Sequence, residues 1–393
     1  MTIHVTRLDD VCEINPRMPK TVSDEDLASF LPMAAVSEDG HISFEEQREV
    51  REVKKGYTYF ERGDVLIAKI TPCFENGKAT RTSSLINPIG FGSTEFHVLR
   101  AGDEIDPSYL FHLIWNSRFR EVGANNMTGS AGQKRVPADF IKRLQIPLPP
   151  LDEQRRIAAI LDKADALRRK RKRALELLNG LPQSIFVEMF GDPLKDQKDS
   201  GDWTCEPLDA SISYIDYRGK TPPKAETGVR LITAKNVKMG YINPEPMEFI
   251  EADAYDHWMT RGFPKMGDVL FTTEAPLGNV AILDSPDKLA VGQRLLTMQP
   301  DKSKIKSEYL AYFLRSPGFS KKMIENSSGS TVRGIKSRLL KRIDICYPPI
   351  EHQARFAAAL RTLNAIKEQA SALHIGADSL FASLQHRAFS GQL

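Results

Sequence analysis

The 393-residue sequence predicts an α/β protein with two mixed α/β domains, related by pseudo-two-fold symmetry and separated by two long antiparallel coiled-coil helices. Two observations predict this fold class. Three blocks of sequence recur in the same order about 200 residues apart, which indicates an internal duplication. In each copy a short strand ends at a pair of prolines, and a long amphipathic segment follows it.

The recurring blocks place the domain boundaries. They are "GDVL" at Gly63–Leu66 and Gly267–Leu270, "DPSYLFHLIWNSRF" from Asp106 with "KSEYLAYFLRSPGF" from Lys306, and "VPADFIKRLQIPLPPLDEQ" from Val136 with "IKSRLLKRIDICYPPIEHQ" from Ile335. Chance similarity would not keep three blocks in order. We therefore expect α/β domains at residues 1–150 and 196–350, a central helical region at 151–195 and a C-terminal helical region at 351–393.

Each copy contains recognisable strands and helices. "DVLIAKI" and "DVLFTT" are short, apolar and preceded by glycine, so they are predicted strands. "YLFHLIWNSRF" and "YLAYFLRSPGF" carry apolar residues at helical spacing. "LQIPLPP" and "IDICYPP" alternate like strands and then stop, because two prolines remove backbone donors and disfavour a helix just before them.

The two long segments after the proline pairs are predicted helices. Asp152, Glu153 and Glu351 lie in their first turns, where the positive end of the helix dipole favours acids. Apolar residues then recur at spacings of three and four, as in a coiled coil in which each helix packs on the other. An ordinary amphipathic helix lying on its own domain is the alternative. The predicted seam consists of Ile157, Ile160, Ala164, Leu167, Leu178, Ala359, Leu363, Ile366, Ala370, Leu373 and Leu380.

Composition narrows the class of protein. The sequence has no run of about 18 apolar residues and no secretory signal at its start, so we expect a cytoplasmic protein with no membrane contact. The four cysteines are scattered, which predicts free thiols and no metal site. The net charge of +3 is small for a protein that binds DNA alone. Any nucleic-acid contact must use local clusters of charge or be shared with a partner.

Two similar domains across two similar helices suit a target with two separated half-sites. Double-stranded DNA is the obvious candidate, because dimeric readers place their half-sites about one helical turn apart. One chain would then do the work of a dimer, so its two half-sites could differ in sequence.

Several motifs together indicate a family. "AKITPCFENGK" with "GFGSTEFHVLR" resembles one type of target-recognition domain, and "IDYRGKTPPK", "RLITAKNV", "GDVLFTTEAPLGNVA" and "GQRLL" resemble another. "PLPPLDEQRRIAAILDKAD", "FVEMFGDP" and "AFSGQL" resemble the helical regions of the same family. Over nearly its whole length, the chain resembles the specificity subunit of type I restriction-modification systems, which serve bacterial defence.

The resemblance implies a division of labour. Each target-recognition domain would read one half of a bipartite DNA site, and the helices would set the spacer between the halves. The helices would also dock two modification subunits, which methylate adenine at N6 with S-adenosylmethionine. Motor-nuclease (restriction) subunits, which use ATP and Mg²⁺, can join this complex. No cofactor and no metal is then expected in this chain.

The residues also indicate that the chain is not itself an enzyme. An amino-methyltransferase holds its flipped base with an Asn/Asp-Pro-Pro-aromatic tetrapeptide, whereas the proline pairs here read "LPPL", "TPPK" and "YPPI". "RGKT" lacks the earlier glycine of a phosphate-binding loop, because Tyr214 stands there. Two alternatives remain: a stand-alone DNA-binding protein, and an Mg²⁺-dependent endonuclease using Asp64, Lys69, Glu75 and Lys78.

Candidate DNA contacts are polar and basic side chains in loops, because Arg, Lys, Asn and Gln read base edges and Lys, Arg, Ser and Thr bind phosphates. The strongest candidates lie in two loops at equivalent places, "GSAGQKR" and "GSTVRGIKSR": Gln133, Lys134, Arg135, Arg333, Lys336 and Arg338. The second set is Lys69, Asn76, Lys78, Arg81, Arg218, Lys220, Thr221, Lys224, Lys235 and Asn236.

One basic run, "RRKRKR" at Arg168–Arg173, lies in the middle of the first long helix. Such a run is usually a solvated face. The alternative hypothesis is that it faces the phosphates of the DNA spacer, where each neutralised phosphate adds to the salt dependence of binding.

Overall fold

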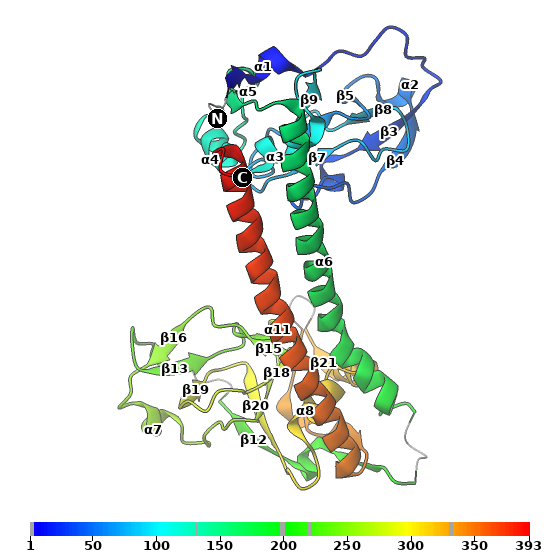
Figure 1. Ribbon diagram of the computed structural model, residues 1–393. Coiled ribbons are helices and arrows are strands. Elements are labelled where there is room, and N and C mark those ends of the chain that lie inside the picture. The colour runs from blue at the N-terminus through cyan, green and yellow to red at the C-terminus, as the bar shows by residue number, and fades with distance from the viewer. Residues whose placement is uncertain (1–3, 131, 197–200, 218–221, 330–332) are drawn as a thin grey trace. The chain divides into compact units, whose positions relative to one another are not determined.

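The computed structural model describes residues 4–130, 132–196, 201–217, 222–329 and 333–393. The chain divides into two compact units: unit 1 is Met1–Ala174 with Ala370–Leu393, and unit 2 is Leu175–Gln369. Each unit holds one mixed α/β domain and a part of each of two long helices (Figure 1). The predicted mixed α/β class is confirmed. The symmetry between the domains and their boundaries stay predictions.

Among the described residues, the domain of unit 1 contains two four-stranded sheets and one two-stranded sheet. The sheet β2-β9-β6-β7 is antiparallel, whereas β4-β3-β8-β5 is mixed because β3 and β8 run parallel. The strands are β1 (Val5–Arg7), β2 (Cys12–Ile14), β3 (Leu27–Leu31), β4 (Glu46–Glu49), β5 (Thr58–Glu61), β6 (Val65–Ala68), β7 (Ala79–Arg81), β8 (Ile89–Gly92), β9 (Phe96–Ala101) and β10 (Gln145–Pro147). The short helices are α1 (Leu8–Val11), η1 (Met33–Ala35), α2 (Val50–Val53), α3 (Pro107–Trp115), α4 (Ser117–Asn125) and α5 (Ala138–Lys142).

The domain of unit 2 has the same two kinds of sheet, but among the described residues its mixed sheet has three strands. Its antiparallel sheet has the order β12-β20-β17-β18, and its mixed sheet has the order β16-β13-β19 with β13 and β19 parallel. The strands are β11 (Thr204–Pro207), β12 (Ile212–Asp216), β13 (Val229–Ile232), β14 (Val237–Lys238), β15 (Tyr241–Ile242), β16 (Glu248–Ile250), β17 (Val269–Thr272), β18 (Val280–Ile282), β19 (Leu289–Val291), β20 (Leu295–Pro300), β21 (Ser327–Ser328), β22 (Gly334–Ile335) and β23 (Asp344–Tyr347). The short helices are η2 (Leu208–Ala210), α7 (Tyr255–Trp258), α8 (Ser307–Phe313), α9 (Pro317–Glu325) and α10 (Ser337–Leu340).

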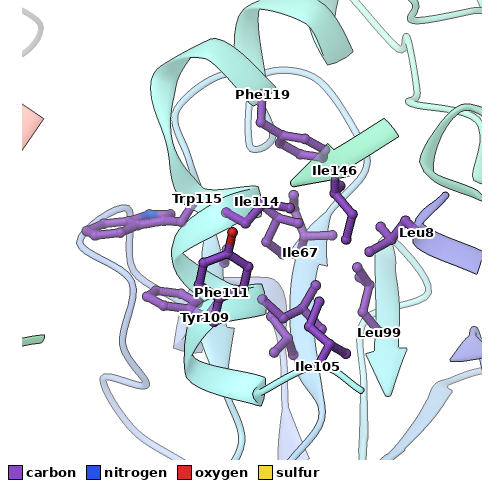
Figure 2. Packing of buried hydrophobic residues seen from close by; sticks show 14 of the residues in the cluster. Leu8, Ile67, Leu99, Ile105, Tyr109, Phe111, Ile114, Trp115, Phe119 and Ile146 are labelled. Atoms are coloured by element: carbon purple, nitrogen blue, oxygen red, sulfur yellow. The ribbon is translucent and has the colours of Figure 1, made fainter. Parts of the chain in front are cut away.

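The matching strand orders confirm the predicted duplication. The segments predicted as strands from "DVLIAKI" and "DVLFTT" are β6 and β17, and every residue of both strands is buried. In unit 1 the core around β6 includes Ile67, Leu99 and Tyr109 (Figure 2). Burial of these apolar side chains is the main stabilising term of each domain.

One predicted helix is interrupted. The segment "YLFHLIWNSRF" forms two helices, α3 and α4, because Asn116 lies between them in an extended conformation. Its Oδ1 accepts a hydrogen bond from the N–H of Phe119 at 2.8 Å and so caps the second helix.

Both long helices begin directly after the proline pairs: α6 is Leu151–Phe190 and α11 is Ile350–Phe389. A fully buried glutamine in the first turn anchors α6 to the domain of unit 1. Gln154 Oε1 accepts from the N–H of Asp106 at 2.8 Å, and its Nε2 donates to Glu104 O at 2.9 Å and to Pro149 O at 2.8 Å. The Tyr109 hydroxyl donates to Pro147 O at 2.9 Å and holds the preceding strand. We call this arrangement the glutamine joint.

Unit 2 contains the same joint. Gln353 is fully buried; its Oε1 accepts from the N–H of Lys306 at 2.9 Å, and its Nε2 donates to Lys304 O and Pro348 O. The Tyr309 hydroxyl donates to Cys346 O at 2.6 Å. A buried amide with all of these bonds satisfied fixes both the start and the direction of its helix, because an unpaired amide inside the protein is costly.

The two long helices run antiparallel within unit 1. Arg171 of α6 donates to Leu373 O of α11 at 2.7 Å, and Ile157, earlier on α6, shares a core with Ala388, later on α11 (Figure 1). In unit 2, Phe186 of α6 packs on Phe356 of α11, with ring centroids 5.4 Å apart. Within the described residues, no helix is long and apolar enough to cross a membrane.

The predicted seam is only partly correct. Ile157 and Leu363 are buried, and Ile160, Ala164, Leu178, Ala359 and Ala370 are partly buried. The seam prediction is wrong for four residues, because their side chains are 44 to 56% exposed: Leu167, Ile366, Leu373 and Leu380. The residues buried instead include Leu161, Phe356, Leu360 and Phe381. Phe381 packs on Trp115 of α3 at 5.7 Å between ring centroids, so the helices face their domains as well as each other.

The expectation of four free thiols is also wrong. Cys205 and Cys346 form a disulfide, because β11 and β23 pair antiparallel with these two residues directly opposite each other. The bond links the first strand of the second domain to its last. Cys12 and Cys73 are free, and burial raises the pKa of the Cys12 thiol to about 12.

The glutamine joint predicts a stability change. Gln154→Ala leaves the N–H of Asp106 and two carbonyls without their buried partner, and roughly 1–3 kcal/mol is lost for each such group. We expect a fall of at least about 2 kcal/mol in the free energy of unfolding of unit 1, measured by urea denaturation. The control is Gln47→Ala, an exposed position on β4 of the same unit. An equal effect of the two substitutions would contradict the joint.

Candidate nucleic-acid interface

Three loop segments of unit 1 meet at one end of its antiparallel sheet. The N–H of Lys69, after β6, donates to Glu95 O, before β9, at 2.8 Å. The N–H of Val136 donates to Lys69 O at 2.9 Å, and the N–H of Thr71 donates to Lys134 O at 3.0 Å. We name this arrangement loop corner 1, which consists of residues 69–71, 93–95, 128–130 and 132–136.

Unit 2 builds the same corner from counterpart residues. The N–H of Thr273 donates to Arg294 O at 3.0 Å, and the N–H of Ile335 donates to Thr273 O at 3.0 Å. Glu274 and Gly334 form an antiparallel bridge, as Ile70 and Arg135 do in unit 1. We name this loop corner 2, which consists of residues 273–275, 292–294, 327–329 and 333–336. The two polar loops singled out in the sequence therefore occupy equivalent places in the fold.

Corner 1 brings together four of the predicted contact residues. Gln133 and Lys134 are exposed, and Lys69 is half-buried. Arg135 is ion-paired with Glu95, with 2.8 Å between Nη2 and Oε1. The hydrogen bonds from Arg135 hold the pKa of the Glu95 carboxyl below its usual value, so the pair remains charged at neutral pH.

Three other predicted residues of the first domain lie on or before β7. Asn76 donates to Glu38 at 2.9 Å, and the Lys78 ammonium donates to Met33 O at 3.2 Å. Arg81 requires a correction. Its guanidinium binds Asp162 of α6 at 2.9 Å and lies over the Phe111 ring, so it joins the sheet to the long helix instead of facing a ligand.

The predicted residues of the second domain fall into several groups. Arg333 and Lys336 are exposed in corner 2, and Arg338 is exposed on α10. Arg218, Lys220 and Thr221 lie outside the described residues. Whether the exposed side chains bind DNA stays a prediction.

The remaining three predicted contact residues of the second domain lie in the segment 222–238. Lys235 is exposed, whereas Lys224 is ion-paired with Glu248 at 2.6 Å. The prediction that Asn236 contacts DNA is wrong, because Asn236 is fully buried. Its Oδ1 accepts from the N–H of Thr233, and its Nδ2 donates to Asn243 O and Pro246 O. Both the oxygen and the nitrogen of the Asn236 amide are thus bonded to backbone groups of the segment 233–246.

Sequence reasoning missed three residues of the corners: Glu95, Glu274 and Arg294. Arg294 is ion-paired with Glu274, with 3.1 Å between Nε and Oε1. The available signal was the repeat itself, because aligning "STEF" with "GQRLL" places Glu95 opposite Arg294.

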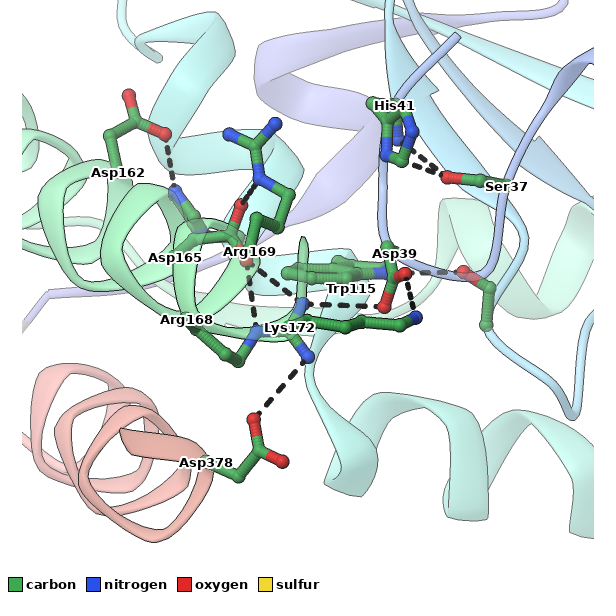
Figure 3. A network of polar contacts seen from close by, with 12 residues as sticks. Ser37, Asp39, His41, Trp115, Asp162, Asp165, Arg168, Arg169, Lys172 and Asp378 are labelled. Carbon is green, nitrogen blue, oxygen red and sulfur yellow. Dashed lines mark hydrogen bonds and ion pairs between the residues drawn. The ribbon is translucent and has the colours of Figure 1, made fainter. Parts of the chain in front are cut away.

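The basic run on α6 is mostly occupied by contacts inside unit 1 (Figure 3). Arg168 is ion-paired with Asp165 at 2.9 Å, with Asp39 at 3.6 Å and with Asp378 of α11 at 3.9 Å. Its guanidinium also lies 5.5 Å from the centre of the Trp115 ring. These contacts fasten α11 and the loop of Asp39 to α6.

Further members of the run are also held. Arg169 binds Asp165 at 2.8 Å, and Lys172 binds Asp39 at 2.5 Å. Lys170 and Arg173 are exposed. The hypothesis of a run that faces DNA phosphates is therefore reduced to these two side chains.

One of the residues suggested for an endonuclease, Asp64, is already engaged inside the domain. Asp64 is buried, and both of its carboxylate oxygens bind Arg100 at 2.8 Å. Its Oδ2 also accepts from the N–H of Glu61 at 2.7 Å. The carboxylate holds the turn before β6, and its oxygens are already engaged within the domain.

Two equivalent α/β domains, each with a polar loop corner, define a duplicated protein with a candidate binding site in each domain. A family model for the type I restriction modification DNA specificity domain matches residues 2–177 and 215–373. The chain belongs to this family.

Curated relatives agree with that assignment. The type I restriction enzyme EcoAI specificity subunit of Escherichia coli is 49% identical over 155 residues, which are 39% of this chain and 26% of the relative. The EcoEI specificity subunit of the same organism is 43% identical over 159 residues, which are 40% and 26%. The putative MjaX specificity subunit of Methanocaldococcus jannaschii is 26% identical over 281 residues, which are 68% and 63%. The matched part thus spans about a quarter of each E. coli relative.

Solved structures share the fold. A chain described under "Structural basis underlying complex assembly and conformational transition of the type I R-M system" has a TM-score of 0.66 at 21% identity and covers 99% of this chain and 98% of its own. The S subunit of a type I restriction-modification system from M. genitalium has a TM-score of 0.55 at 13% identity and covers 99% and 96%.

The contact between Asp162 and Arg81 predicts a pH dependence. Burial raises the pKa of the Asp162 carboxyl, but hydrogen bonds from His112 and Arg81 outweigh it and bring the pKa to about 2. A lowered carboxylate pKa stabilises the fold above the ordinary value of 3.8, and this contribution is lost as the pH falls toward 2. The difference in Tm between wild type and Asp162→Asn should be largest above about pH 4 and should shrink toward pH 2.

The control for this measurement is Asp152→Asn, whose side chain is 98% exposed. It should change Tm much less, because exposed ion pairs contribute little. A constant Asp162→Asn difference at every pH would show that the charge of Asp162 does not stabilise the fold.

Proposed function

We propose that this chain is the DNA sequence-recognition subunit of a type I restriction-modification complex, and that each domain reads one half of a bipartite site. The observation that carries the proposal is the pair of loop corners, which are built by the same backbone bonds in both domains. Each corner carries exposed cationic side chains, Lys134 in the first and Arg333 and Lys336 in the second. Such side chains bind the phosphates of DNA.

The charge of the chain supports a shared binding mode. The net charge is only +3, and several of the arginines are held by acids of the same unit. A partner that adds positive charge around the DNA would supply the remaining affinity. We therefore propose two modification subunits as partners, with restriction subunits as further members of the complex.

Exposed apolar side chains on the long helices support docking of these partners. In unit 1, Leu373, Ile375 and Leu380 of α11 are 55 to 63% exposed. In unit 2, Leu177 and Val187 of α6 are 67% and 47% exposed. Apolar side chains left open along a helix favour association with another protein. We propose that these faces bind the methyltransferase subunits and that the helices set the spacer.

In this proposal the chemistry belongs to the partners. S-adenosylmethionine is bound by the modification subunits, and ATP and Mg²⁺ by the restriction subunits, so this chain is non-catalytic. The engagement of Asp64 by Arg100 argues against a nuclease site at that position. A stand-alone DNA-binding protein would bind its site tightly without a methyltransferase subunit, and a binding measurement on the isolated chain distinguishes the two cases.

A domain exchange tests the proposal. Residues 1–150 are replaced by the corresponding domain of a relative, and the chain is expressed with its methyltransferase subunits. Sequencing that detects N6-methyladenine should then report a changed first half-site, an unchanged second half-site and an unchanged spacer. The reciprocal exchange of residues 196–350 is the control. A change in both halves, or in neither, would rule out independent reading by the two domains.

The basic run gives a separate prediction about DNA affinity. The double substitution Lys170→Gln with Arg173→Gln should make the slope of log binding constant against log salt less steep by about 0.9 for each phosphate that is no longer neutralised. Arg169→Gln should leave the slope unchanged, because Asp165 already neutralises Arg169. The slope is measured on the assembled methyltransferase complex. Identical slopes for all variants would show that the run does not face DNA.

A further inference from the structure

Corner 1 contains an arginine held in one orientation by an acid. Arg135 donates from Nε to Glu95 Oε2 at 2.9 Å and from Nη2 to Glu95 Oε1 at 2.8 Å, and Nη1 donates to Gln133 O at 3.2 Å. The Arg135 side chain is nevertheless 43% exposed. The guanidinium is thus fixed on one side and open on the other.

Corner 2 also contains an arginine paired with an acid. Arg294 lies directly before β20 with a positive φ of 65°, and its Nε is 3.1 Å from Glu274 Oε1. The Arg294 side chain is 52% exposed. Gly334 leaves room for the acid, because a Cβ at this glycine would lie 3.3 Å from the Glu274 Cβ.

The two pairs are built from positions that do not correspond. Glu95 and Arg294 are counterparts, since each accepts the same backbone bond from the residue that follows β6 or β17. The counterpart of Arg135 is Gly334, and that of Glu274 is Ile70. The acid thus lies before β9 in corner 1 but after β17 in corner 2. The arginine lies in segment 132–136 in corner 1 but before β20 in corner 2. The two corners therefore share only the pairing of an arginine with an acid: Arg135 donates two hydrogen bonds to Glu95, and Arg294 makes one contact with Glu274 at 3.1 Å.

The chemistry of the guanidinium indicates what corner 1 presents. A guanidinium has five N–H groups, and Glu95 and Gln133 use three of those on Arg135. One hydrogen remains on each terminal nitrogen. Two free donors on one guanidinium can bind the O6 and N7 acceptors of guanine in the major groove. Holding the fork in advance reduces the side-chain entropy that binding would otherwise cost.

We propose that Arg135 and Arg294 each read a guanine, one in each half-site, and that Glu95 and Glu274 are the residues that position them. This inference rests on the proposed function. The neighbouring exposed cations, Lys134 and Arg333, bind phosphates and carry no sequence information.

The test uses the complete chain assembled with its methyltransferase subunits. The assembly methylates a pool of DNA in which every position of both half-sites is randomised, and sequencing gives the base preference at each position. Arg135→Gln should weaken the preference for one base pair of one half-site by roughly 5- to 150-fold. Arg294→Gln should do the same in the other half-site. Glu95→Gln should keep the preferred base and reduce the preference.

Lys134→Gln is the matched control. It should slow methylation of all sequences and leave every preference unchanged, because a phosphate contact is not specific to sequence. If Arg135→Gln does not fold, Arg135→Lys is used, since it keeps the charge and loses the fork; it should weaken the same preference.

Two outcomes would overturn the inference. One is unchanged preference at every position in the arginine variants. The other is a loss of preference spread over several positions of a half-site, which would mean that the ion pair only holds the loops. In both cases the wild-type assembly still methylates a bipartite site, so the proposed function stands. Absence of a bipartite site in wild type would instead refute the proposed function.

Discussion

The glutamine joint is the constraint on which each unit depends. A proline pair ends the last strand of the domain, and one buried amide then ties the new helix to two carbonyls and one N–H of the preceding segments. Prolines alone would stop the strand and leave the direction of the helix open. The amide removes that freedom, because any other direction would leave buried polar groups without partners. Since both copies use it, each domain holds its helix in the same way.

Much of the fold could be predicted from the repeat and from the prolines. Those signals are local: a glycine before an apolar run predicts β6 and β17, and a proline pair predicts the starts of α6 and α11. The seam could not be predicted as well, because heptad spacing assumes that a helix has one neighbour. Here α11 also packs on the domain, through Phe381 and Trp115. Its buried face therefore includes Phe381, while Leu373 and Leu380 stay exposed.

The candidate site shows the same division between local and distant information. Small and polar residues correctly predicted exposed loops around Gln133 and Lys134. The roles of Arg81 and Asn236 depend on partners that lie elsewhere in the chain or in the turn, such as Asp162 for Arg81. Charge alone does not tell a free arginine from a bound one. Likewise, the Cys205–Cys346 bond depends on the pairing of β11 with β23, which 141 residues of sequence separate.

The first and last strands of each domain are hydrogen-bonded neighbours: β1 pairs with β10, and β11 pairs with β23. Chain entry and chain exit are therefore adjacent in each domain. A segment with adjacent ends can be excised and replaced by another of different length without moving what flanks it. Recombination between genes at these strand borders would consequently generate new combinations of domains on an unaltered pair of helices.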